Sequence, residues 1–421
     1  MQIDAATRRS LELVTNMAGQ RSGSLLSTID ATLTGGGGRL LERRLTAPST
    51  DLNKIAKRLD NVEAHAEASG VRSEARSVLR KCPDLERALS RLSLDRGGPR
   101  DLGAIRGALR TANWLSDKPL PQSQALALPN AVLQNLEDAL KEDLPSMIRE
   151  GGFIAENYDS TLDEVRQLRD EGRSVIAGLQ TKYAELTGIN SLKVKHNNVL
   201  GYFIEVTSIH ADAMLARSEQ FIHRQTTANA TRFTTVELSD LERRILNAGA
   251  EALAQEKLHF GKLRELCLKS SVELARIAVA LAEVDLETAL AELAVQDNWV
   301  RPKSTDYTAF KIEDVRHPGV EAALRKSVDT SFVANSCELT KAVDDAAVWL
   351  LTGPNMAGKS TFLRQNALIA ILAQMGSFVP ARSAEIGIVS QLFSRVGASD
   401  DLARGRSTFM VEMVETAAIL N

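Results

Sequence analysis

The sequence predicts a mostly α-helical protein that carries a small β module within its helical part and an α/β segment near its end. Three observations support this prediction. No proline occurs between Pro145 and Pro302, and apolar stripes at helical spacing lie toward both ends of this interval. Between the stripes, the apolar period changes from about 3.6 to about 2 residues. Residues 353–360 read GPNMAGKS and follow an apolar run, as a strand, glycine-rich loop and helix would.

The bulk composition is that of an ordinary globular protein, with 44% apolar and 25% charged residues. A chain of 421 residues should form two or three domains. The net charge of −3 argues against a uniformly basic nucleic-acid-binding protein but permits a local basic patch. Cys82, Cys267 and Cys337 are few and far apart, so the sequence indicates neither a disulfide framework nor a metal site. We expect a cytoplasmic protein without a signal peptide or membrane segment.

Prolines divide the first part of the chain into helices of ordinary length. One helix is expected from about residue 51 to 68, with Leu52, Ile55, Leu59 and Val62 on one face. The run Gly35–Gly38 stands at a position that would suit the start of a helix, and we favour a flexible turn there.

Two long helices are expected in the proline-free interval, because an interior proline would cost ~3 kcal/mol and none occurs. The first stripe runs from Leu162 to Leu186, and the second from Leu241 to Leu293. A helix of about 50 residues would reach roughly 75 Å. Two such helices, running antiparallel with a β module at their tip, would form a lever.

The β module should begin with a hairpin. Residues 192–196 alternate in polarity, Asn197-Asn198 offers a turn, and residues 202–206 alternate again, with a further extended segment at 221–235. Basic and polar side chains of the kind that bind DNA phosphates cluster in these stretches, although an ordinary solvated surface fits equally well. The predicted DNA-contacting residues are Lys193, Lys195, His196, Arg224, Gln225, Asn229 and Arg232.

After Pro302 the pattern is that of an α/β nucleotide domain. Short strands are expected at 307–315, 331–339 and 385–393, a buried strand at 348–351, and a helix from 363 to 375. In the loop between strand and helix, glycines let backbone N–H groups close on phosphate oxygens. Lys359 would place its ammonium on the outer phosphates, and the Ser360 hydroxyl would ligate Mg²⁺. The sequence therefore predicts a nucleotide site.

Other chemistry-bearing residues are less informative. Asp344-Asp345 and Asp400-Asp401 do not follow apolar strands, so we interpret them as loop acids and not as Mg²⁺ ligands. His317 precedes a proline and is interpreted as a packed loop residue. A helix should start at Ser407 or Thr408, and by itself this pattern indicates only a capped helix.

Several segments together resemble one known family. Residues 352–365, TGPNMAGKSTFLRQ, and 378–413, which include GASDDLARGRSTFMVEM, closely resemble the MutS family of DNA mismatch-repair ATPases. Residues 4–9, DAATRR, resemble the opening of the family's core domain, and residues 188–206 and 221–233 resemble its clamp. The resemblance spans essentially the entire chain.

The resemblance implies four parts: a helical core and lever (1–186), a DNA-contacting β clamp (187–240), a returning lever helix (241–298) and an ABC-type P-loop ATPase domain (299–421). It implies that Phe332 stacks on adenine and that Ser407 reaches the γ-phosphate held by a partner subunit. Double-stranded DNA, mismatched for the full-length family, a second MutS-like subunit and a MutL-type protein are the implied partners. The implied ATP-binding loop comprises Gly353, Pro354, Asn355, Met356, Ala357, Gly358, Lys359, Ser360 and Thr361.

Departures from the family pattern limit these expectations. The family's mismatch-reading and connector domains have no counterpart, and neither has its Walker B Asp-Glu pair or its later His. We therefore expect the middle of a longer protein, with an incomplete ATPase sheet, no complete catalytic set, reduced Mg-ATP affinity and turnover close to absent. Two alternatives stay open: a non-catalytic helical DNA-binding scaffold, and the family's clamp-lacking endonuclease paralogue. The hairpin at 192–206 argues against the second alternative.

Overall fold

The computed structural model divides into two compact units. The first comprises Met1–Arg87, Gly107–Pro129 and Ser271–Asn421, and the second comprises Ala88–Arg106 and Asn130–Ser270. No helix within the described residues is both long enough and apolar enough to cross a membrane. The residues that the structure describes are 1–127, 130–197, 200–325, 332–339, 347–354 and 357–395, with 413 and 417.

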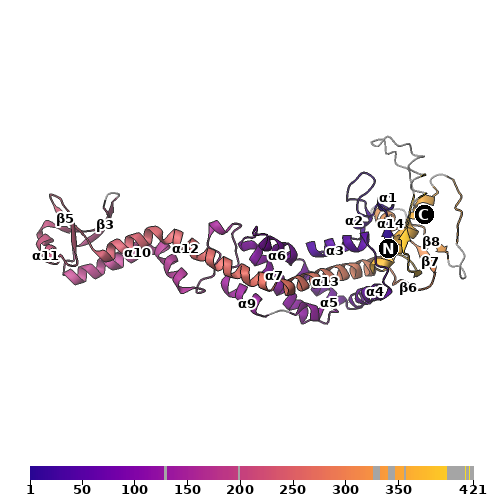
Figure 1. The fold of residues 1–421 in the computed structure, drawn as a ribbon, viewed down its shortest axis with the longest axis horizontal. Coiled ribbons are helices and arrows are strands. Elements are labelled where there is room, and N and C mark those ends of the chain that lie inside the picture. Colours follow the sequence, from indigo (N-terminus) through magenta and orange to yellow (C-terminus); the bar gives the residue numbers. More distant parts are fainter. Residues whose placement is uncertain are drawn as a thin grey trace. The chain divides into compact units, whose positions relative to one another are not determined.

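The first unit is built around one buried helix. The helix α13 (Ser271–Asp297) is buried on every side from Val284 to Ala291, and α3, α4, α5 and α8 pack around it. The predicted helix at 51–68 is confirmed as α4, which buries Ile55, Leu59 and Val62 and is capped by Asp51. Figure 1 shows α3 and α4 beside α13. The helices here are α1 (Ala5–Ser10), α2 (Leu25–Ile29), α3 (Gly35–Thr46), α4 (Leu52–Glu67), α5 (Ser69–Leu79), α8 (Ser123–Leu126), α14 (Pro318–Leu324) and α15 (Lys359–Met375), while α6 (Leu85–Ser93) and α7 (Pro99–Ser116) have residues in both units.

The four-glycine run is the first turn of α3, so the expectation of a flexible turn was wrong. Thr34 caps this helix by accepting a hydrogen bond from the amide of Gly37. The Asp285 carboxylate of α13 accepts hydrogen bonds from Leu33 N at 2.9 Å and from Thr34 N at 2.8 Å. A Cβ on Gly37 would lie 2.1 Å from Asp285 Oδ2. Close packing on a buried carboxylate therefore explains this glycine better than a need for flexibility.

A second carboxylate of α13, Glu287, is buried among polar side chains. It accepts hydrogen bonds from Asn61 Nδ2 of α4, at 3.2 Å, and from Gln122 Nε2, and the guanidinium of Arg44 lies 3.8 Å away. Burial raises the pKa of Glu287 to about 7, and the neighbouring Glu283 also raises it, whereas Arg44, Asn61 and Gln122 act in the opposite direction.

This raised pKa predicts how stability changes with pH. The folded chain holds the Glu287 proton more tightly than the unfolded chain, whose ordinary pKa is 4.5, so the stabilisation is complete below pH 4.5 and is lost as the pH rises through about 7. The variant Glu287→Gln keeps the shape but does not ionise. Urea unfolding at pH 5 and pH 8 should therefore show the variant gaining stability over the wild type as the pH rises. Parallel pH profiles would contradict this assignment.

The sheet of the first unit is mixed rather than parallel. Its order is β6-β9-β7-β8, in which β6 pairs with β9 in parallel and the other two pairings are antiparallel. The expected strand at 385–393 proves to be two short strands with different partners, since within the described residues β9 pairs with β6 and β7 whereas β10 pairs with β1. The strands of this unit are β1 (Gln2–Ile3), β6 (Lys303–Thr305), β7 (Phe310–Val315), β8 (Asn335–Glu338), β9 (Ser383–Gly387) and β10 (Gln391–Leu392).

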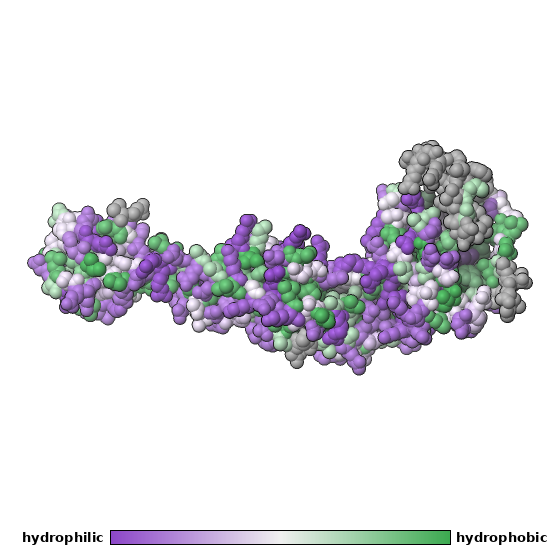
Figure 2. All heavy atoms as spheres, in the orientation of Figure 1, coloured by the Kyte–Doolittle hydropathy of each residue, from purple (hydrophilic) through white to green (hydrophobic). Residues whose placement is uncertain are grey.

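The second unit pairs two long helices with a small sheet. The helices α10 (Ser160–Thr187) and α12 (Val236–Lys269) lie side by side, with the sheet at one end (Figure 1). Hydrophilic residues cover much of the surface of this helix pair in the view of Figure 2, because the apolar stripes face inward. The remaining elements are α9 (Asn130–Ala139), η1 (Ile148–Glu150), β2 (Lys193–Asn197), β3 (Gly201–Thr207), η2 (Ser208–His210), α11 (Ala211–Leu215), β4 (Ile222–Thr226) and β5 (Ala230–Thr234).

The predicted hairpin is confirmed, and the predicted returning helix is corrected. The sheet order is β2-β3-β5-β4, with every pairing antiparallel. The second stripe is divided at Ser270 into α12 and α13, which belong to different units. The helix α12, with 34 residues, therefore extends about 51 Å rather than the roughly 75 Å expected, and α10, with 28 residues, is kinked by non-helical backbone at Glu171.

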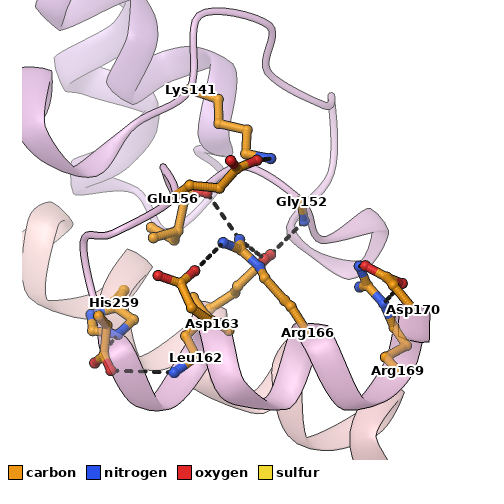
Figure 3. Close-up of polar contacts among 12 residues, drawn as sticks. Lys141, Gly152, Glu156, Leu162, Asp163, Arg166, Arg169, Asp170 and His259 are labelled. Atoms are coloured by element: carbon orange, nitrogen blue, oxygen red, sulfur yellow. Dashed lines mark hydrogen bonds and ion pairs between the residues drawn. The ribbon is translucent and has the colours of Figure 1, made fainter. Parts of the chain in front are cut away.

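A buried ion pair joins the two long helices. Glu256 of α12 is 1% exposed and accepts a hydrogen bond from Arg166 Nη2 of α10 at 2.5 Å. Its other oxygen accepts from the amide of Gly152 at 2.6 Å. Figure 3 shows Arg166 pointing from α10 toward Asp163 and the Gly152 loop. The sequence did not predict this pair, because neither Arg166 nor Glu256 can be told from an exposed charged residue of a long helix by its spacing.

Candidate functional site

The predicted phosphate loop (residues 353–360) lies at the start of a buried helix. The helix α15 begins at Lys359 and follows Gly358, whose φ of 82° is the left-handed conformation that glycine adopts without strain. Among the residues that the structure describes, no side chain caps the first N–H groups of α15. These amides are therefore available to an anionic ligand. Asn355 and Met356 lie outside the described residues.

The ammonium of Lys359 folds back over its own loop. Its Nζ donates hydrogen bonds to the carbonyl oxygens of Gly353, at 2.6 Å, and Pro354, at 2.7 Å. The side chain thus ties the beginning of the loop to the beginning of α15. To reach an outer phosphate, the ammonium would exchange these two carbonyl contacts for phosphate oxygens.

A pocket of about 590 Å³ opens beside the loop. Its lining includes five residues predicted for ATP: Phe332, Ala357, Gly358, Lys359 and Thr361. Pockets of about 300–1,000 Å³ are typical of small-molecule sites. The structure therefore brings Phe332 and the phosphate loop to one concave site, although they are far apart in the sequence.

The segment that leads into the loop differs from the prediction. Residues 347–354 form no strand, and the side chains of Val348 and Leu350 are 85% and 89% exposed. Within the described part of the chain, no strand pairs with this segment. An apolar run becomes a buried strand only where neighbouring strands accept its backbone hydrogen bonds, so the expected buried strand at 348–351 is not observed.

An aromatic pair was missed by the sequence reasoning. The rings of Trp349 and Phe362 stack with centroids 6.3 Å apart and planes 7° apart, and both residues line the pocket. Aromatic residues make up only 4% of the chain, yet one lies on each side of the glycine-rich loop. This placement was the sequence signal that could have predicted the pair.

His317 is confirmed as a packed residue. Its Nδ1 accepts a hydrogen bond from Val320 N at 3.3 Å and caps α14, and burial lowers its pKa to about 4. Cys82, Cys267 and Cys337 are free thiols. The candidate at Ser407 and the acidic pairs at 344–345 and 400–401 lie outside the described residues.

Four predicted DNA-contacting residues share one face of the sheet in the second unit. Glu205 of β3 is paired with Lys193 of β2 and with Arg232 of β5, which is paired with Gln225 of β4. Cross-strand partners point to the same side, and so does Lys195, two residues along from Lys193. We call these residues, with Glu205, the polar sheet face.

Glu205 partly neutralises this face. Its oxygens contact Lys195 Nζ at 2.6 Å and Arg232 Nε at 3.2 Å. The hydrogen bond from Lys195, with further help from Arg232, holds the pKa of Glu205 below its ordinary value. The Arg232 guanidinium also lies 4.7 Å from the centre of the Phe203 ring. Lys195 and Arg232 thus share a single carboxylate, and Lys193 adds a third cation, which leaves a positive excess on the face.

The other three predicted DNA contacts lie elsewhere on the sheet. His196 is paired with Tyr202 on the opposite face, where their rings are 4.8 Å apart, so it lies away from the polar sheet face. Arg224 occupies the bulge between His223 and Gln225, and Asn229 lies in the turn between β4 and β5. Alternation along a strand, not clustering in the sequence, decides which side chains share a surface.

Comparison with known families identifies both regions. Residues 6–291 match the family described as MutS domain III, and residues 349–421 match MutS domain V. The first match includes the helices from α2 to α12 and the small sheet β2–β5, and the second includes the phosphate loop and α15.

Relatives among curated proteins extend this result to the whole chain. The chain is 60% identical to the DNA mismatch repair protein MutS of Dinoroseobacter shibae, 58% to that of Cereibacter sphaeroides and 57% to that of Paracoccus denitrificans. Each similarity covers 100% of this chain and 49% of the relative, so the chain spans about half the length of the curated relatives it matches. The chain belongs to the MutS family.

Proposed function

We propose that this chain acts in DNA mismatch repair, as a part of a MutS-type protein that binds ATP with Mg²⁺ and contacts duplex DNA. The arrangement around Lys359 supports the nucleotide part most strongly. A glycine-rich loop, the uncapped start of α15 and the pocket with Phe332 all meet at this residue.

The residues at this site fit a nucleoside triphosphate with its metal ion. Free N–H groups and the Lys359 ammonium suit phosphate oxygens, and the Ser360 hydroxyl is a hard oxygen ligand of the kind that Mg²⁺ prefers. Phe332 would stack on the adenine. Mg²⁺ would neutralise phosphate charge at the beginning of α15, while the protein supplies orientation and hydrogen bonds.

The DNA part of the proposal rests on the polar sheet face. Its charge is positive, and its lysine, arginine and glutamine side chains suit phosphate oxygens, so it would bind the phosphate backbone. We expect the same face to contact matched and mismatched duplexes alike. ATP binding would be coupled to closure of a dimer around DNA, with Ser407 of one subunit reaching the nucleotide of the other and a MutL-type protein as a further partner.

Direct binding of Mg-ATP to the purified chain separates this proposal from its main alternative. A non-catalytic helical scaffold would bind DNA through the same sheet and show no nucleotide binding that depends on Lys359. The exposed run at 348–351 is the observation that favours the scaffold, because the strand that should support the loop is not formed.

The small sheet gives a prediction in which two variants act in opposite directions, one at Lys195 of the polar sheet face with Arg224 at the bulge, and one at Glu205. The double variant Lys195→Ala with Arg224→Ala should weaken duplex binding equally on matched and mismatched DNA, and should reduce the salt slope by about one unit per lost phosphate contact. Glu205→Gln should strengthen binding, because it releases Lys195 and Arg232 from their shared carboxylate. Fluorescence anisotropy across a salt titration measures both effects. A loss confined to mismatched DNA, or weaker binding by Glu205→Gln, would contradict a backbone-contacting role.

A further inference from the structure

The end of α15 opposite to the phosphate loop is held by one buried side chain. Gln374 is 1% exposed, and its amide nitrogen donates hydrogen bonds to Ser49 O at 2.7 Å and Val389 O at 3.1 Å. Its amide oxygen accepts from Val389 N at 2.8 Å. Both polar atoms of this side chain are therefore hydrogen-bonded to backbone groups. Because the side chain is buried, removing one of these hydrogen bonds would leave an unpaired polar group and cost free energy.

Backbone contacts strengthen the same junction. The segment between α3 and α4 (residues 47–51), here called the α3–α4 linker, donates Ser49 N to Gln374 O at 3.1 Å. Arg58 of α4 donates Nη1 to Met375 O at 3.2 Å, which places a cation at the carboxyl end of α15. Gly376 follows with a φ of 90°, and a Cβ there would meet Arg58 Cβ at 2.4 Å. The chain is thus shaped to bring these elements into contact.

The linker is itself tied to the helical layer. It joins α3 to α4, and both of these helices pack on α13. The Pro48 carbonyl in the linker also accepts a hydrogen bond from the N-terminal ammonium of Met1 at 2.6 Å. A displacement of Ser49 would therefore displace α3 and α4, the helices that precede and follow the linker.

The intervening helix is suited to carry a displacement. All residues of α15 from Leu368 to Met375 are buried, so the last two turns are enclosed by neighbours. A hydrogen-bonded helix of 17 residues, about 25 Å long, moves largely as one body. Movement at Lys359 would then appear at Gln374.

We propose that Gln374 is a positioning residue that couples the phosphate loop to the α3–α4 linker, so that binding of a nucleoside triphosphate changes the linker. This inference rests on the proposed function, because it requires that the loop binds such a ligand. Gln374 lies at the far end of α15 and acts through the helix. Coupling of this kind is reciprocal, so a change in the linker also alters affinity at the loop.

Hydrogen exchange of the 421-residue chain, with and without saturating Mg-ATP, tests the proposal. In the wild type, ATP should change amide exchange in peptides that cover residues 47–51. Gln374→Leu should reduce this linker response by about fivefold while Lys359-dependent ATP binding persists, because the amide bridge is removed and the volume is nearly kept. Gln374→Glu should also reduce the linker response, since a carboxylate cannot donate a hydrogen bond to Ser49 O. If Gln374→Leu does not fold, Gln374→Glu is the variant to measure.

Gln365→Leu is the matched control on the same helix. Gln365 is also fully buried, but within the part of the chain that the structure describes its amide has no hydrogen-bond partner. This variant should keep the wild-type linker response. Should the linker not respond in a wild-type chain that binds ATP, or respond fully in a folded Gln374 variant, the coupling is overturned and the proposed function stands. Absence of Lys359-dependent ATP binding overturns the proposed function and the coupling together.

Discussion

Replacing Lys359 with alanine is expected to weaken Mg-ATP binding about 10- to 100-fold, because hydrogen bonds to a charged group contribute about 1.5–3 kcal/mol. The ammonium would no longer reach the outer phosphates, and this is the contact that the wild type gains when it exchanges the carbonyl oxygens of Gly353 and Pro354 for phosphate oxygens. Isothermal titration of the purified chain with Mg-ATP measures the change directly.

Lys311→Ala is a suitable control for this experiment. Lys311 lies on β7 of the same unit, and its Nζ is 3.9 Å from Glu338 Oε2, outside the pocket lining. Its removal deletes the same charge without touching the loop, so ATP affinity should be unchanged. Equal affinities for the wild type and Lys359→Ala would show that the loop does not hold the triphosphate.

The second large effect is expected in the long helices. Glu256→Ala should destabilise the second unit by about 3–5 kcal/mol, because it leaves the buried guanidinium of Arg166 without its main counter-charge. The remaining contacts of Arg166 are the Ile154 carbonyl at 2.9 Å and Asp163 at 3.5 Å (Figure 3). The Gly152 amide also loses its acceptor. Urea unfolding followed by circular dichroism, with hydrogen exchange to locate the change, provides the measurement.

Two comparisons isolate the buried charge. Glu265→Ala removes an exposed carboxylate of the same helix, paired with Lys269 at 2.9 Å, and should cause no measurable change because such pairs are screened by water. The double variant Arg166→Met with Glu256→Leu should recover most of the lost stability, since apolar residues of similar size often replace a buried ion pair without cost. Destabilisation of the double variant as large as that of Glu256→Ala would indicate a packing defect rather than an unpaired charge.

The local elements were the most predictable part of this structure. Periodicity placed α4, α10 and the hairpin β2–β3 close to their observed bounds, because apolar spacing is set by which face of an element is buried. Glycines and Lys359 at fixed spacing placed the phosphate loop before a helix.

Predictions failed where a neighbour distant in the sequence decides the conformation. The glycine run was interpreted as a flexible turn because its partner, Asp285, lies 248 positions beyond Gly37. The apolar run at 348–351 was interpreted as buried because its sequence carries no record of whether a sheet pairs with it.

The sequence by itself determined the element types, the phosphate loop and the resemblance to MutS proteins, because these depend on residues close together along the chain. Tertiary structure alone decided which side chains meet: Phe332 and Lys359 at one pocket, Glu205 between two cations, and Gln374 against Ser49. The physical reason is that burial and hydrogen bonding between distant segments are fixed by packing in three dimensions, which local spacing does not specify.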